Sequence, residues 1–183
     1  WVKEGGAPPA SQYPRLQDHT LVPVASIAFP AIPGVASPHT PTAGARVANP
    51  YLPGGAGAGT PLPLFVPAVD EDGNERAGIR LPDVAVPLAT YTGWNFRQPA
   101  IGAPGELVSL LGSSIPFPLT RAARDATKDP RRSIDERYRS QEDYLAKIEQ
   151  AADALVKGGY LLVDDEPRIL QRATDLWEHI VVV

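Results

Sequence analysis

The sequence predicts an α+β chain in which a proline-rich, extended first part with a β-hairpin is followed by a helical subdomain. Of the 21 prolines, only Pro130 and Pro167 come after Pro118, whereas most of the Lys, Arg, Asp and Glu residues do. Proline lacks an amide donor and disfavours helix in the residue before it, so residues 1–118 should be mainly extended. Helix-capping residues recur beyond this point, and we therefore expect residues 119–183 to be helical.

Length and composition limit the possible functions. The 183 residues suffice for one domain with a core, and the net charge of −4 comes from interspersed acids and bases. The chain begins with Trp1 and has no methionine, so we expect it to be a piece of a longer polypeptide. With no cysteine, disulfides and thiolate catalysis are excluded, and no apolar run is long enough to predict a membrane span.

One compact basic group stands out, consisting of Arg131, Arg132, Arg137 and Arg139. It is mixed with acidic residues, a pattern that is typical of a solvated helical surface. We therefore expect no nucleic-acid partner.

The first part contains an apolar strap and a turn. Within the strap, residues 19–35, apolar side chains recur between prolines at Leu21, Val24, Ile27, Phe29 and Ile32. Left uncovered, they would form an exposed apolar surface, so we expect them to be buried against a body outside this chain. Farther along, Asp72-Gly73 separates the apolar runs 62–69 and 77–88 and predicts a β-hairpin.

The acids of this turn, in the sequence DEDGNE at Asp70–Glu75, also suggest a calcium loop. The spacing does not fit, because glycine stands fourth rather than sixth and Leu81 occupies the place of the bidentate glutamate. His19, His39 and His179 show no metal-ligand spacing either. We predict no metal site and no cofactor.

Four helix starts follow Pro118. Thr120 can cap a helix that Asp129-Pro130 ends. Ser133 with Glu136 forms a capping box for a short turn through Tyr138. The third and fourth starts begin the two long helices.

Ser140 with Asp143 begins the first long helix, which reaches about Lys157 and carries an apolar stripe of Tyr144, Ile148, Ala151 and Leu155. Asp164 or Asp165 caps the second, with Pro167 in its first turn. Its inner face should hold Ile169, Ala173, Leu176, Trp177 and Ile180. Glycines 158 and 159 separate the two helices, which we expect to form an antiparallel hairpin.

The most distinctive segment is residues 80–118, which contains TYTGWNFR. Its candidate substrate-pocket or interface residues are Tyr91, Thr92, Trp94, Asn95 and Arg97. In a functional interpretation they form the aromatic walls and polar contacts of a pocket, and Gly93 permits a close backbone approach. In a structural interpretation Trp94 and Tyr91 pack at an interface with the rest of the protein, while Asn95 satisfies backbone groups. We favour the structural interpretation.

This segment, RLPDVAVPLATYTGWNFRQPAIGAPGELVSLLGSSIPFP, closely resembles the C-terminal region of the bacterial alpha/beta-hydrolase domain-containing proteins. The resemblance extends from Trp1 to about Trp177. It implies that a serine nucleophile, an acid and a histidine precede this region in the longer polypeptide. By the same resemblance, the chain is the C-terminal extension of an α/β hydrolase. The N-terminal hydrolase part would be its partner, and a small-molecule substrate would be bound by the assembled enzyme. The compartment stays open, either cytoplasmic or exported.

The residues themselves offer no catalytic group. Nucleophilic catalysis needs a hydroxyl or thiol, a base and an orienting acid, and no Gly-x-Ser-x-Gly elbow is present. Ser113 and Ser114 form the nearest serine pair, and we expect them to bind backbone groups. The predicted function is therefore that of the non-catalytic part of a serine ester or amide hydrolase, stabilising the body and shaping substrate access.

Two alternatives remain open. In the first, the chain is a protein-interaction or scaffold module with no hydrolase role, and the helical hairpin binds a partner. In the second, which we rank last, it is an enzyme that uses a pair of carboxylates.

Overall fold

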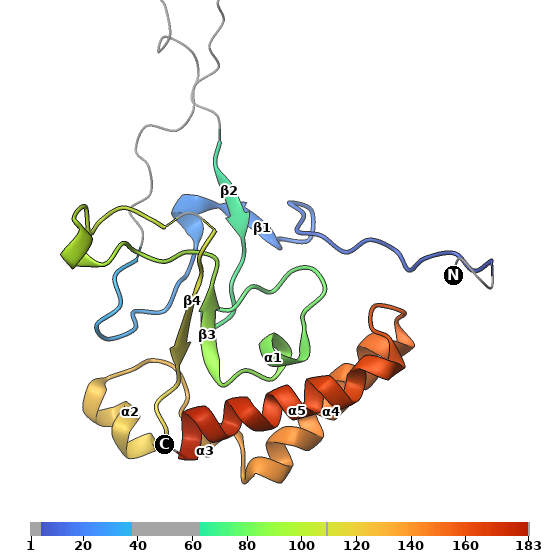
Figure 1. The fold of residues 1–183 in the computed structure, drawn as a ribbon. Helices are drawn as coiled ribbons and strands as arrows, with labels where there is room; N and C mark the ends of the chain where they lie inside the picture. The colour runs from blue at the N-terminus through green and yellow to red at the C-terminus, as the bar shows by residue number, and fades with distance from the viewer. Residues whose placement is uncertain (1–4, 38–62, 109, 183) are drawn as a thin grey trace, which may run out of the picture.

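The computed structural model describes residues 5–37, 63–108 and 110–182, in which short strands lie above a layer of helices (Figure 1). The elements are β1 (Leu21–Pro23), β2 (Phe65–Pro67), α1 (Pro82–Ala85), β3 (Ala89–Thr92), β4 (Ser113–Pro116), α2 (Arg121–Thr127), α3 (Ile134–Arg137), α4 (Gln141–Lys157) and α5 (Glu166–Trp177). Short 3₁₀ turns lie at Val24–Ser26, Pro99–Ile101 and Val163–Asp165, and a π-helical turn at Glu178–Val182 follows α5. Within the described residues, the mixture of small sheets and helices agrees with the predicted α+β class.

Two antiparallel ladders organise the extended part. In the first, β1 pairs with β2, with Val22 opposite Val66; in the second, β3 pairs with β4, with Thr90 opposite Ile115. Both ladders are short and end in prolines, because a proline cannot donate to a neighbouring strand.

The hairpin prediction is correct for its turn and wrong for its second strand. The amide of Asp70 donates to the carbonyl of Asn74 at 2.8 Å, and Gly73 adopts a φ of +82°. The strands on either side, however, meet only in a single bridge between Val69 and Glu75. Residues 77–88 instead contain α1, which begins at Pro82, a position where a missing amide costs little.

The strap packs on this turn. A Cβ atom at Gly73 would lie 2.9 Å from the Phe29 ring and 3.1 Å from Pro30, so only glycine fits beneath the strap. Ile32 is buried and Phe29 half-buried, whereas Ile27 is 37% exposed. The expectation that the whole strap needs a body outside the chain is therefore wrong for Ile32, which lies beside the end of β4 and α2 of the chain itself.

The predicted helix starts are mostly confirmed. The hydroxyl of Thr120 accepts from the amide of Ala123 at 3.1 Å, and Ser133 with Glu136 forms the full capping box of α3. Ser140 caps α4. Asp165 occupies the N-cap position of α5 but makes no side-chain cap, because the 3₁₀ turn before it already places its backbone in the helical region.

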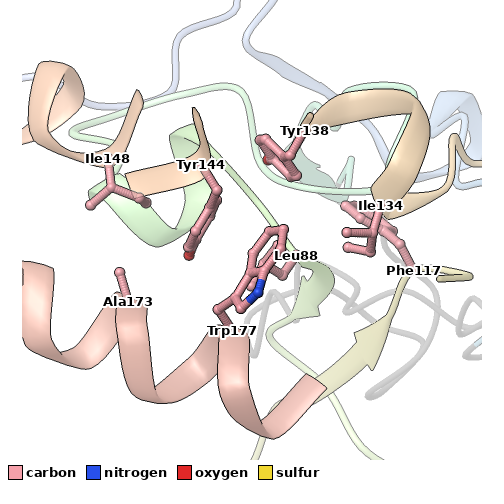
Figure 2. Packing of buried hydrophobic residues seen from close by; sticks show 8 residues of the cluster. All are labelled: Leu88, Phe117, Ile134, Tyr138, Tyr144, Ile148, Ala173 and Trp177. Atoms are coloured by element: carbon pink, nitrogen blue, oxygen red, sulfur yellow. The ribbon is translucent and has the colours of Figure 1, made fainter. Parts of the chain in front are cut away.

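Helices α4 and α5 form the predicted hairpin (Figure 1). Tyr144, near the start of α4, stacks on Trp177, at the end of α5, with ring centroids 5.2 Å apart. One turn farther along α4, Ile148 lies opposite Ala173, so the helices run antiparallel (Figure 2). The buried stripe of α4 continues to Ala152 rather than to the predicted Ala151.

The hydrophobic core joins the helices to the extended part. Its buried members are Leu88, Phe117, Ile134, Tyr138, Tyr144, Ile148, Ala173 and Trp177 (Figure 2). Leu88 and Phe117 belong to the first predicted part, residues 1–118, and the others to residues 119–183. The two parts therefore share one core.

Arg131 is buried where the two parts of the chain meet. Its side chain is 2% exposed, so the prediction of a solvated basic surface is wrong for this residue. The guanidinium donates twice to Asp129, at 3.0 and 2.7 Å, and once to the Thr90 hydroxyl at 2.9 Å. The backbone carbonyls of Ile115 and Pro116 accept the remaining two hydrogens, at 2.9 and 3.1 Å. All five donors are satisfied, which is what allows a charge to be buried at this point.

The ion pair sets the charge state of Asp129. Burial raises the pKa of this carboxyl, but the hydrogen bonds from Arg131 outweigh burial and hold the pKa below its ordinary value. The pair is therefore charged at neutral pH, and removing one partner would leave an uncompensated buried charge.

A second arginine, Arg137, also connects the helical part of the chain to the extended part. Arg137 forms a bidentate ion pair with Asp72 of the turn, and its guanidinium lies 4.1 Å from the centre of the Phe117 ring. The Tyr138 hydroxyl also donates to the carbonyl of Pro87 at 2.8 Å. Short helix α3 thus holds both the turn and the segment before β3.

We predict that Arg131→Ala lowers the free energy of unfolding by about 3–5 kcal/mol, because Asp129 would remain buried without a partner. Urea denaturation followed by circular dichroism measures the change. The matched control is Arg132→Ala, an exposed neighbour, for which we expect a change within about 0.5 kcal/mol. Equal effects of the two substitutions would contradict the role given to Arg131.

Candidate functional site

The five candidate residues lie at the end of β3 and in the segment that follows it. Tyr91 and Thr92 are the last residues of the strand, while Trp94, Asn95 and Arg97 come after it. All five are half-buried. They do not converge on one point, because strand alternation and the turn at Gly93 direct them to different neighbours.

Trp94 packs inside this chain. Its ring centroid lies 5.7 Å from that of Phe29 in the strap and 5.6 Å from that of Phe96, in tilted and edge-on arrangements. Such geometries are favourable for aromatic pairs. The ring therefore fixes the strap to the segment after β3.

The backbone of this segment is held by hydroxyl groups. The Thr92 hydroxyl donates to the carbonyl of Trp94 at 2.6 Å and accepts from the amide of Ser113 at 3.1 Å. The Ser113 hydroxyl donates to the same carbonyl at 3.0 Å, so it binds backbone as the sequence predicts. Asn95 contributes a long hydrogen bond of 3.4 Å to the carbonyl of Gly112.

The glycine that a close approach requires is Gly112, not Gly93. A Cβ atom at Gly112 would lie 2.2 Å from the carbonyl oxygen of Thr92, which is impossible, whereas one at Gly93 would meet nothing within 4 Å. Proximity to Trp94 in the sequence favoured Gly93, but the contact is made across the ladder of β3 and β4.

Beneath β3 lies a buried polar residue that sequence reasoning missed. Asn74 is fully buried, and its side-chain amide donates to the carbonyl of Ala89 at 3.1 Å while its oxygen accepts from the amide of Tyr91 at 2.7 Å. The turn thereby supplies the hydrogen bonds of a neighbouring strand. The only sequence signal was the pattern of DEDGNE itself, where asparagine follows the turn glycine.

A small cleft adjoins two of the candidates. It has a volume of about 250 Å³, and Tyr91 and Thr92 line it together with Arg80, Leu81 and Val84. This volume lies below the roughly 300–1,000 Å³ that is usual for ligand pockets. Trp94, Asn95 and Arg97 do not line it.

The Tyr91 phenol can donate a hydrogen bond but cannot act as a base. Burial, with a further contribution from the Asp83 carboxylate, raises its pKa to about 12. The hydroxyl is buried and has no hydrogen-bond partner within the protein. At neutral pH it therefore stays protonated.

The described residues contain no nucleophile-base pair. No serine or threonine hydroxyl in residues 5–37, 63–108 or 110–182 is hydrogen-bonded to a histidine. His19 lies in a loop and His179 in the helical turn after α5, while His39 falls outside the described residues. This arrangement cannot activate a serine by the mechanism of a catalytic triad.

Two of the four acids of the turn, Asp70 and Asp72, are engaged by the protein. Asp70 accepts from the amides of Asp72 and Asn74, at 3.1 and 2.9 Å, and pairs with Arg80 at 2.9 Å. Asp72 pairs with Arg137. In the part of the chain that the structure describes, no group of three His, Cys, Asp or Glu residues could hold a metal ion.

The chain belongs to the Alpha/beta hydrolase domain family, which matches residues 1–171. Comparisons with curated proteins and with solved structures gave no match. Among the described helices, none combines the length and apolar character that crossing a membrane requires.

We predict that Trp94→Ala lowers the free energy of unfolding by about 2 kcal/mol, roughly half the cost of deleting a fully buried aromatic ring, because Trp94 is half-buried. Trp94→Phe should lose less, since it keeps one ring against Phe29. Urea denaturation of the two variants gives the comparison. If unfolding were unchanged by Trp94→Ala, the packing role would be excluded.

Asn74→Ala and Asn95→Ala form a matched pair, because both side chains bind backbone groups of β3 or next to β4. We expect Asn74→Ala to cost about 1–3 kcal/mol, because it leaves two buried backbone groups without partners, and Asn95→Ala to cost below about 1 kcal/mol. Thermal unfolding by circular dichroism measures both. A larger effect at Asn95 than at Asn74 would reverse this ranking.

Proposed function

We propose that the chain is the non-catalytic C-terminal part of a serine ester or amide hydrolase, where it stabilises the catalytic body. The observation that carries the proposal is the combination of membership in a hydrolase family with a sequence that lacks the serine elbow. A hydrolase of this class needs a nucleophile and base, so both would come from another segment of the assembled enzyme.

The rigidity of the TYTGWN segment supports a stabilising role. Buried polar contacts hold β3: Asn74 binds the backbone of Ala89 and Tyr91, and the Thr90 hydroxyl binds Arg131. A segment held in this way can present side chains to a neighbouring surface without losing further conformational freedom.

We further propose that this part shapes substrate access. Tyr91 and Thr92 line the cleft next to β3, and the Tyr91 ring would form part of a wall rather than a reacting group. The cleft is too small to hold a substrate alone, so in this proposal the body completes it.

We predict that the isolated chain does not hydrolyse short p-nitrophenyl esters above background. Ser113→Ala and Ser114→Ala serve as controls, since neither should change the measured rate. Turnover that is lost in either variant would mean that the chain carries its own nucleophile, and the proposal would be wrong.

A further inference from the structure

Part of the basic group borders an open groove that the proposed function does not use. Arg132, Arg137 and Lys147 line this groove together with Tyr138 and Gln150. The rest of the lining is apolar and comes from α1, α4 and the segment after α1: Ala85, Val86, Pro87, Ala151 and Ala154. The volume of the groove is about 620 Å³, within the roughly 300–1,000 Å³ that is usual for ligand pockets.

The lining of the groove is held in place by contacts within the chain. Tyr138 is 7% exposed, and its hydroxyl bond to the carbonyl of Pro87 joins the end of α3 to the segment after α1. Helix α1 in turn packs against α4. The Arg137 side chain is 12% exposed and is fixed by Asp72. A ligand would therefore meet a preformed surface and would not have to order these side chains on binding.

The lining carries an excess of positive charge. Three of its side chains are cationic, and none of the described residues that line it is acidic. Acids outside the lining compensate two of the cations, Asp72 at Arg137 and Asp143 at Lys147. Arg132 forms no ion pair in the part of the chain that the structure describes. One uncompensated cation suits a ligand with a single negative charge.

The guanidinium of Arg132 also has donors to offer. It donates to the carbonyl of Glu136, and its other N–H groups have no partner among the described residues. The planar fork of an arginine matches the two oxygens of a carboxylate. The Lys147 ammonium, 5.2 Å from the centre of the Tyr138 ring, adds positive potential to the same groove.

We propose that this groove binds an aliphatic monocarboxylate. Its carboxylate pairs with Arg132, and its hydrocarbon chain lies on the alanine, valine and proline side chains of the lining. The charge of the groove favours an anion over a neutral or cationic ligand, and the apolar lining favours a hydrocarbon chain over a wholly polar anion. Binding of this ligand goes beyond the function proposed above and does not depend on it.

Isothermal calorimetry of the 183-residue chain with sodium octanoate tests the proposal. We expect saturable binding in the millimolar range or tighter. Octanamide has the same chain length without the charge, and acetate has the charge without the chain, so each should bind at least about tenfold more weakly. Absence of octanoate binding, or equal binding of either comparison ligand, would overturn the proposal.

Arg132→Ala and Arg139→Ala are the matched variants. Both arginines are exposed members of the basic group, but Arg139 does not line the groove. Arg132→Ala should weaken octanoate binding about tenfold, because it removes the charged hydrogen bonds to the carboxylate. Arg139→Ala should bind within about twofold of the unaltered chain. Circular dichroism should show both variants folded, and equal effects on binding would count against the role of Arg132.

A third variant tests the apolar part of the groove. Ala154 is an exposed position of α4, so Ala154→Glu should leave the fold intact while it places a like charge beside the ligand. Octanoate binding should fall at least about tenfold, and unchanged binding would place the ligand elsewhere. If the longer polypeptide failed to bind octanoate although the 183-residue chain bound it, another segment would occupy the groove and the proposal would be wrong.

Discussion

The buried guanidinium of Arg131 is the interaction on which the rest of the structure depends. The extended part of the chain forms only short ladders, and the helices have one apolar face to bury. Arg131 joins them by binding the Thr90 hydroxyl in β3 and two carbonyls at the end of β4. Asp129, in the same loop, supplies the compensating charge. Arg131 can therefore bind β3 and β4 without leaving an unpaired ion buried.

The acidic turn contributes in a complementary way. Two of its four carboxylates are paired with arginines, Asp70 with Arg80 and Asp72 with Arg137. The amide of Asn74 then completes the hydrogen bonding of β3. The two arginines thus connect the turn to α1 and α3.

The polar contacts around β3 are extensive in the described residues. Asp129 and Asp72 are engaged in ion pairs with Arg131 and Arg137, and burial raises the pKa of the Tyr91 and Tyr138 phenols. The polar contacts fix the backbone around β3, where the most distinctive segment of the sequence lies. Firm placement of that segment is the property that links the fold to the proposed role.

The sequence by itself determined the helices and the mainly extended backbone of the proline-rich first part, residues 1–118. Capping at Thr120, Ser133 and Ser140 depends on residues three apart, and proline acts on its own backbone, so local chemistry was sufficient. The inner face of α5 followed from its helical periodicity. Family resemblance in residues 80–118 likewise required no structure.

Tertiary structure alone decided which polar groups are buried. In the sequence Arg131 and Arg132 are equivalent, yet one is enclosed and the other exposed, because only Arg131 reaches Thr90, 41 residues away. The same holds for Gly112, whose need for glycine arises from the carbonyl of Thr92 across the ladder. Such contacts join residues distant in the chain, and no local pattern encodes a partner that only folding brings within reach.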